Sequence, residues 1–113
     1  MIQVYHNPRC SKSRECLLFF ENSGKEYEVV QYLNDTPNYE ELKAIIKKLG
    51  IKPIELVRQK EALWISKFNG KKMTGSQIIR AMVANPILIE RPIVINGDKA
   101  VIARPIEAAH SII

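Results

Sequence analysis

A strand–helix–strand pattern in the first 31 residues constrains the fold of this chain more than any other feature. The apolar run at 2–5 predicts a buried strand. Residues 11–22 place apolar side chains at helical spacing and stop before Gly24. Residues 27–31 alternate as a second strand does. Such a unit requires parallel strands joined by a right-handed crossover.

The C-terminal part of the chain predicts a different strand pairing. An Asn-Gly pair at 96–97 separates the apolar segments 92–95 and 100–102, which is a strong signal for an antiparallel hairpin. Arg104-Pro105 then predicts a final helix with proline at its first position. A parallel βαβ unit followed by a hairpin and a helix is the plan of the thioredoxin fold. We therefore expect an α/β, thioredoxin/glutaredoxin-like fold with a small mixed sheet.

The segment between the two halves, about residues 36–86, is expected to be a helical insertion within a single domain spanning residues 1–113. Asn38 and Glu41 have the spacing of a capping box, which predicts the start of a helix. Gly50 is expected to end that helix, and Pro53 to begin a short helical turn.

The periodicity is weak from 59 to 73, where lysines surround Trp64 and Phe68. Basic residues with interleaved aromatics can bind nucleic acid, but a solvated loop with two anchoring aromatics is more common, so nucleic-acid binding is disfavoured. Thr74 or Ser76 is expected to cap the next helix, which Asn85-Pro86 ends.

Charge and composition limit the partners of the protein. The chain has 17 basic and 12 acidic residues among 113, a net charge of +5, which indicates an anionic partner. The basic residues are dispersed, which favours a small anion over a polymer. The chain contains no apolar stretch of membrane-spanning length and no signal-peptide pattern, and its two cysteines indicate a reducing compartment. We expect a cytoplasmic protein with no membrane partner.

Cys10 lies where the first strand gives way to the first helix, with Arg9 and Lys12 close by in sequence. A helix N-terminus and nearby cations both favour a thiolate over a thiol. The alternative is a small hydrophobic residue buried in a turn. Cys16 lies about 9 Å further along the helix, beyond the roughly 7 Å that a disulfide allows between Cα atoms. Because position 13 is serine, a second reacting thiol would have to come from another molecule.

Three arginines, Arg58, Arg91 and Arg104, lie at the ends of apolar segments. A guanidinium group can bind a tetrahedral oxyanion through paired hydrogen bonds. The alternative is three surface arginines whose stems cover the core. The thioredoxin plan would also place a cis peptide at Arg91-Pro92, facing the cysteine turn.

His6 and Ser13 flank the cysteine in sequence. A nearby imidazole would favour the thiolate, and the Ser13 hydroxyl could point toward it; the alternative for each is a local hydrogen bond in the turn. No group of residues has metal-ligand spacing, and the chain has no glycine-rich phosphate loop.

Taken together, these residues resemble the glutaredoxin-dependent arsenate reductases and their close relatives, across essentially the whole chain. The resemblance includes these elements: His6-Asn7-Pro8, Cys10, Ser13-Arg14, residues 22–24, Tyr32-Leu33, the segment at Arg58, residues 86–94 and Arg104-Pro105.

The resemblance implies a thioredoxin-like fold and a single nucleophilic cysteine, Cys10, kept ionised with help from His6. It implies that Arg58, Arg91 and Arg104 surround arsenate or a similar oxyanion. The thiolate would attack arsenate, glutathione would add as co-substrate, glutaredoxin would resolve the adduct and arsenite would leave. No tightly bound cofactor is expected.

Two other functions stay open for relatives with this fold. One is a monothiol oxidoreductase acting on glutathione mixed disulfides. The other is a redox-linked regulator that binds RNA polymerase, which Ser13 disfavours because that branch uses a Cys-Xaa-Xaa-Cys pair.

Overall fold

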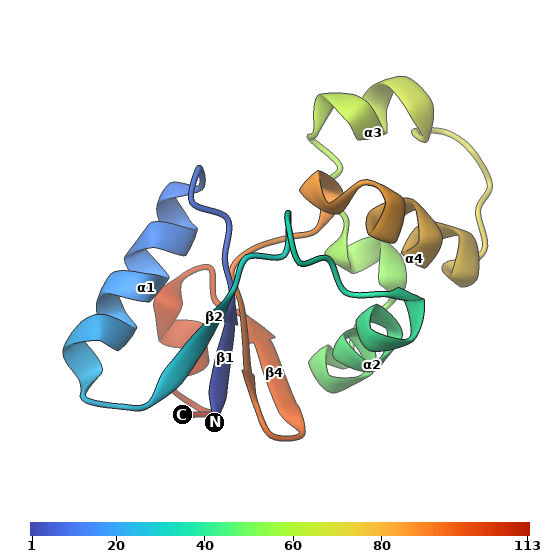
Figure 1. The fold of residues 1–113 in the computed structure, drawn as a ribbon. Helices are drawn as coiled ribbons and strands as arrows, with labels where there is room; N and C mark the ends of the chain where they lie inside the picture. Colours follow the sequence, from blue (N-terminus) through green and yellow to red (C-terminus); the bar gives the residue numbers. More distant parts are fainter. The chain divides into compact units, whose positions relative to one another are not determined.

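Four short strands form one mixed sheet in the computed structural model, which describes residues 1–113. The strands are β1 (Ile2–Tyr5), β2 (Tyr27–Val30), β3 (Ile93–Asn96) and β4 (Lys99–Ile102). They are ordered β2-β1-β3-β4, with β1 parallel to β2 and the β1–β3 and β3–β4 pairs antiparallel (Figure 1). The predicted βαβ unit and hairpin are confirmed, and with them the thioredoxin-like plan.

Helix α1 (Ser11–Ser23) makes the crossover from β1 to β2. It ends at Gly24, whose φ of 74° lies in the left-handed region that glycine adopts without steric cost. One hydrophobic cluster joins this helix to the sheet and to the C-terminal segment; its buried members are Ile2, Val4, Cys16, Phe20, Val94, Ala103 and Ala109.

The predicted C-terminal helix is wrong in extent. The segment forms a single 3-10 turn, η3 (Ile106–Ala109), and Pro105 precedes its first residue. Ala109 is fully buried in the cluster, and the Asn96 side-chain amide donates a hydrogen bond to the Ile112 carbonyl. Because these contacts hold the chain end against the sheet, the segment does not continue as an α-helix.

The chain divides into two compact units. One comprises Met1–Asp35 and Arg91–Ile113 and contains the sheet; the other is Thr36–Glu90. The second unit contains these elements: α2 (Tyr39–Leu49), the 3-10 turn η1 (Pro53–Leu56), α3 (Ala62–Lys67), α4 (Gly75–Ala84) and the 3-10 turn η2 (Pro86–Leu88). That the whole chain is one domain with an insertion at 36–86 stays a prediction. None of the helices combines the length and apolarity needed to cross a membrane.

Reciprocal capping begins both longer helices of the second unit. The Asn38 side chain accepts from the Glu41 N–H at 2.9 Å, and the Glu41 carboxylate accepts from the Asn38 N–H at 3.0 Å. Thr74, and not Ser76, caps α4: its hydroxyl accepts from the Gln77 N–H at 3.2 Å. The capping box predicted at Asn38 is therefore confirmed.

The weakly periodic segment 59–73 is not a loop throughout, because it contains helix α3. Trp64 on this helix is 5% exposed, and its ring stacks on Phe68 at a centroid distance of 5.3 Å. The two aromatics therefore anchor the segment as expected. A helix of six residues completes fewer than two turns, too few to give a clear helical period in the sequence.

Candidate functional site

The sheet brings three segments that are distant in sequence to the same end of its strands. Tyr5 at the end of β1 pairs with Ile93 at the start of β3, and Ile93 pairs with Ile102 at the end of β4. The segments that leave or enter the sheet there carry Cys10, Arg91 and Arg104. The strand register is therefore what unites these three residues.

Hydrogen bonds to Asn7 and from the Arg14 side chain hold the loop that carries Cys10. The Cys10 N–H donates to the Asn7 carbonyl at 3.0 Å, and the Asn7 side-chain oxygen accepts from the Arg9 N–H at 2.9 Å. Arg14 donates to the Pro8 carbonyl at 2.9 Å. The sequence alone predicted no structural role for Asn7 or Arg14. An Asn-Pro pair is a known signal for such a turn and could have pointed to Asn7.

Cys10 is the N-cap residue of α1, with extended backbone angles and no side-chain capping bond. Burial alone would raise the pKa of its thiol. The backbone N–H groups of Ser13 and Lys12 and the Arg91 guanidinium oppose this by hydrogen bonding and charge, and the net pKa lies below the ordinary value. The direction is the one predicted from the helix start.

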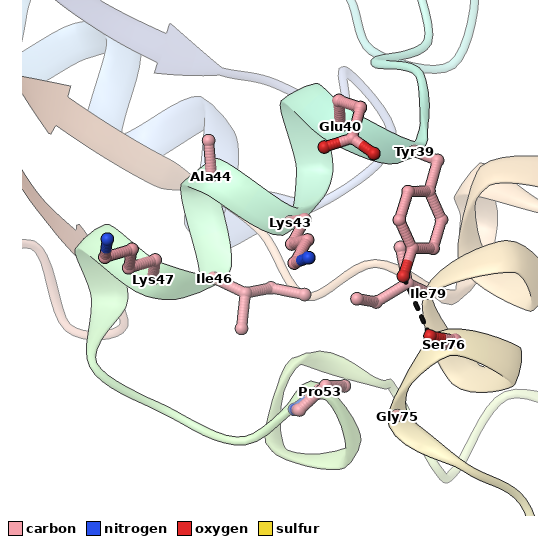
Figure 2. Close-up of a pocket in the computed structure, with 10 residues that line it drawn as sticks. All are labelled: Tyr39, Glu40, Lys43, Ala44, Ile46, Lys47, Pro53, Gly75, Ser76 and Ile79. Carbon is pink, nitrogen blue, oxygen red and sulfur yellow. Dashed lines mark hydrogen bonds between the residues drawn. The ribbon is translucent and has the colours of Figure 1, made fainter.

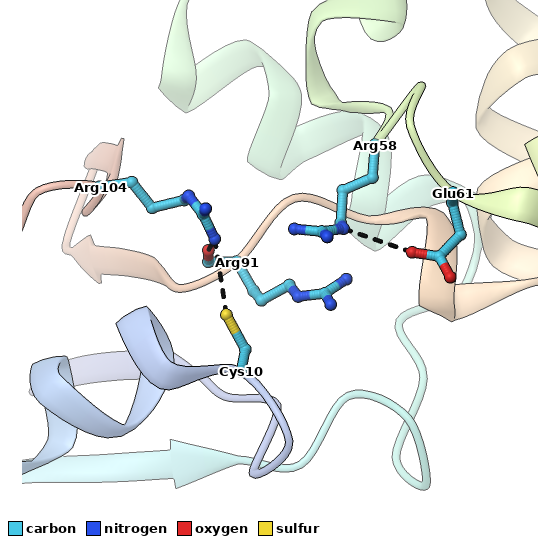
Figure 3. Close-up of polar contacts among 5 residues, drawn as sticks. All are labelled: Cys10, Arg58, Glu61, Arg91 and Arg104. Carbon is cyan, nitrogen blue, oxygen red and sulfur yellow. Dashed lines mark hydrogen bonds and ion pairs between the residues drawn. The ribbon is translucent and has the colours of Figure 1, made fainter.

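Two arginines of the first unit lie beside the sulfur. Arg104 donates through Nη1 to Cys10 Sγ at 3.5 Å and to the Arg91 carbonyl at 3.3 Å (Figure 3). Arg91 is 7% exposed, and the peptide bond that follows it, Arg91-Pro92, is cis as expected. Of the predicted site residues, the structure therefore brings together the Cys10 thiol and the guanidinium groups of Arg91 and Arg104.

Arg58 belongs to the second unit and has its own surroundings there. Its N–H donates to the Leu88 carbonyl at 2.7 Å, next to the bridge between Val57 and Ile89. Its Nε lies 3.4 Å from a Glu61 carboxylate oxygen, and both side chains are about one quarter exposed (Figure 3). A role for Arg58 at the cysteine stays a prediction.

His6 makes its side-chain hydrogen bond with Ser13. Its Nδ1 lies 2.6 Å from the Ser13 hydroxyl, which also accepts from the Asn7 N–H at 3.0 Å. Burial lowers the pKa of His6, a hydrogen bond with the Ser13 backbone raises it, and the nearby Arg14 charge lowers it, so the net pKa falls below its usual value of 6.5. That His6 helps to keep Cys10 ionised stays a prediction. The Ser13 hydroxyl holds the loop, while its backbone N–H faces Cys10.

Cys16 has the opposite surroundings to Cys10. It is fully buried in the hydrophobic cluster of the sheet unit, and burial raises the pKa of its thiol to about 12. Both cysteines are free thiols. No group of three or more His, Cys, Asp or Glu side chains could hold a metal ion. The site can therefore offer one activated sulfur nucleophile beside two fixed positive charges, an arrangement that suits attack on an anion.

Known proteins similar to this chain include arsenate reductases. A model of the ArsC family matches residues 5–112. The arsenate reductase of Haemophilus influenzae is 42% identical over 112 residues, covering 97% of each chain. The uncharacterized protein YfgD of Escherichia coli is 43% identical and covers 99% of this chain and 96% of its own. The structure of an arsenate reductase from Vibrio cholerae superposes with a TM-score of 0.94 at 38% identity, covering 99% of this chain and 97% of its own.

Proposed function

The chain belongs to the ArsC family, and we propose that it is an arsenate reductase whose nucleophile is Cys10. The observation that supports this most directly is the Cys10 sulfur, with its lowered pKa, at hydrogen-bond distance from Arg104 and beside Arg91. A thiolate next to two permanent cations suits an anionic electrophile, because the cations offset the repulsion between the thiolate and the substrate.

The first chemical step forms a sulfur–arsenic bond. The Cys10 thiolate attacks arsenic(V), one As–O bond breaks, and that oxygen leaves as water after taking up protons. Arg91 and Arg104 would bind the remaining oxygens through charge-assisted hydrogen bonds, with Arg58 as the proposed third ligand. His6 and Ser13 would keep the loop and its N–H groups in place.

The electrons must come from thiols outside the chain, because Cys16 is buried and its thiol resists ionisation. We propose glutathione as co-substrate and glutaredoxin as the protein that resolves the adduct, without a tightly bound cofactor and in the reducing cytoplasm. In the overall balance, arsenate gains two electrons, two thiols become one disulfide, and arsenite and one water are released.

A coupled assay tests the proposal. Arsenate-dependent oxidation of NADPH is measured with glutathione, glutaredoxin and glutathione reductase present. We expect turnover by the unmodified protein, none by Cys10→Ser, and retained turnover by Cys16→Ala. Activity that survives Cys10→Ser, or the absence of turnover by the unmodified protein, contradicts the proposal.

The electron source and the substrate class need separate arms of this assay. Omitting glutaredoxin should stop turnover, and thioredoxin with its reductase should not restore it. A glutathionylated peptide supplied in place of arsenate should be reduced far more slowly than arsenate. Faster reduction of the peptide would identify a monothiol oxidoreductase instead.

A further inference from the structure

The net positive charge of this protein comes from one of its two units. Thr36–Glu90 carries ten lysines and arginines against five acidic residues, whereas the remainder of the chain carries seven of each. The whole net charge of +5 therefore belongs to the helical unit. The proposed chemistry at Cys10 uses Arg91 and Arg104 of the other unit and only Arg58 of this one, so it leaves most of this excess unexplained.

The same unit contains a groove of about 560 Å³ between α2, η1 and the first turn of α4 (Figure 2). Its apolar lining residues, here called the floor, are Ala44, Ile46, Pro53 and Ile79. Ile46 and Ile79 also belong to the packed interior of the unit, being 6% and 4% exposed, whereas Ala44 is exposed. The floor is therefore aliphatic and can accept an apolar side chain.

Cations dominate the polar part of the groove. Lys43 and Lys47, both exposed and one turn apart on α2, line it, and Glu40 is the single carboxylate among the lining residues. The first turn of α4, with Gly75 and Ser76, also borders the groove and adds the partial positive charge of a helix N-terminus. A peptide segment that binds here would therefore contact apolar residues on the floor and positive charges along the side of the groove.

Side-chain contacts fix one end of the groove. The Tyr39 hydroxyl lies 2.9 Å from the Ser76 hydroxyl and so links α2 to α4 (Figure 2). The Arg80 guanidinium lies 5.2 Å from the centre of the Tyr39 ring, a cation–π contact that holds a third cation near this end. A groove that is already formed loses less entropy when it binds a partner.

We propose that this groove docks an acidic segment of a partner protein, with an apolar side chain on the floor and flanking carboxylates on Lys43 and Lys47. Charge complementarity selects the acidic partner, and the aliphatic floor selects a peptide over a nucleic acid. Base stacking would need an open aromatic face, but one face of the ring of Tyr39, the aromatic residue that lines the groove, is covered by the Arg80 guanidinium. The docking does not depend on the arsenate chemistry.

Adjacent lysines on α2 provide a matched test. The probe is a fluorescein-labelled peptide with two leucines four residues apart among glutamates, titrated with the full chain and followed by anisotropy. Lys47→Glu and Lys48→Glu make the same charge change at neighbouring exposed positions of the last turn, but only Lys47 lines the groove. We expect Lys47→Glu to weaken binding about tenfold, the size of one well-placed charge contact, and Lys48→Glu less than about twofold.

Four further arms test the apolar contact and the identity of the occupant. Replacing the leucines of the peptide by serine, or filling the groove by Ala44→Gln, should each weaken binding about tenfold as well, because the floor contact is lost. Equal losses for Lys47→Glu and Lys48→Glu, or tighter binding of a single-stranded oligonucleotide of matched charge, would overturn the proposal. So would failure of the peptide to bind below about 1 mM, or a dimer in sedimentation that Lys47→Glu dissociates.

Discussion

The two cysteines lie six positions apart in the same part of the chain, yet they have opposite environments. Cys10 faces backbone N–H groups and Arg91, whereas Cys16 lies in an apolar cluster with no exposed surface. Since the thiolate is the reactive form, the difference in pKa direction predicts a difference in reactivity.

Counting reactive thiols tests this directly. Reaction of the native protein with Ellman's reagent should release one equivalent of chromophore quickly, and a second only after unfolding in urea. Cys10→Ser should remove the fast phase and Cys16→Ala the slow one. Two fast equivalents in the native protein, or an intact-mass shift showing an internal disulfide after mild oxidation, would contradict the assignment.

Arg91 is predicted to sustain the thiolate. Its side chain hydrogen-bonds to Cys10 and places a positive charge beside it, so Arg91→Gln should raise the pKa of Cys10 and slow alkylation by iodoacetamide at pH 7. Lys12→Gln is the matched control, because Lys12 acts through its backbone N–H and its side chain is exposed. The measurement is the alkylation rate against pH. If the midpoint of this pH dependence is the same in Arg91→Gln as in the unmodified protein, the prediction is wrong.

His6 should make stability depend on pH. Its folded pKa is lowered below 6.5, so the unfolded chain binds more protons in the range just below 6.5, and the free energy of unfolding falls as pH falls through that range. Urea unfolding at several pH values should show this slope. His6→Asn should flatten it, and His110→Gln, which changes an exposed residue, should leave it in place. A slope that persists in His6→Asn assigns the effect to other groups.

At the scale of single elements, the cap of α4 offers a measurable contribution to stability. The Thr74 hydroxyl accepts from the Gln77 N–H, and the Thr74 N–H in turn donates to the Gln77 side-chain oxygen at 2.8 Å. Thr74→Ala should lower the free energy of unfolding by about 1 kcal/mol, the usual cost of losing such a cap. Thr74→Ser keeps the hydroxyl and should cost far less in the same urea titration. Equal losses in the two variants would show that the methyl group, and not the cap, is responsible.

Elements that depend on local signals could be predicted from the sequence, and those that depend on tertiary contacts could not. The Asn38 capping box and the 96–97 turn act within a few residues, and both are found. The short C-terminal turn depends instead on Ala109 and Ile112 meeting the sheet. Helix α3 is too short to give a clear period.

The same distinction between local signals and tertiary contacts applies to the candidate site. Cys10 could be predicted because a strand end, a helix start and nearby cations all act locally in sequence. The bond from Arg104 to Cys10 spans 94 positions and depends on the register of β1, β3 and β4. Likewise, the Ser13 hydroxyl bonds His6 and Asn7 because the loop folds back on α1, which spacing alone does not show.

At the scale of the whole molecule, the activation of Cys10 is contained in one unit. Every group that lowers its pKa, namely Ser13, Lys12 and Arg91, belongs to Met1–Asp35 or Arg91–Ile113. The hydrophobic cluster under the sheet is likewise drawn from these segments alone. We therefore expect the thiol to be reactive without the helical unit.

Excising the helical unit tests this self-sufficiency. Val30 and Ile93 pair with Tyr5 from opposite sides, so they lie about 10 Å apart. A flexible linker of about 12 Gly/Ser residues spans roughly 19 Å and can replace residues 36–90 without strain.

The shortened protein should show a folded spectrum in circular dichroism, and the pH midpoint for alkylation of Cys10 should match that of the full chain. A folded shortened protein with an ordinary thiol midpoint would show that the helical unit contributes to activation. Because Arg58 is removed, arsenate turnover should fall even where the midpoint is kept, which separates activation of the nucleophile from binding of its substrate.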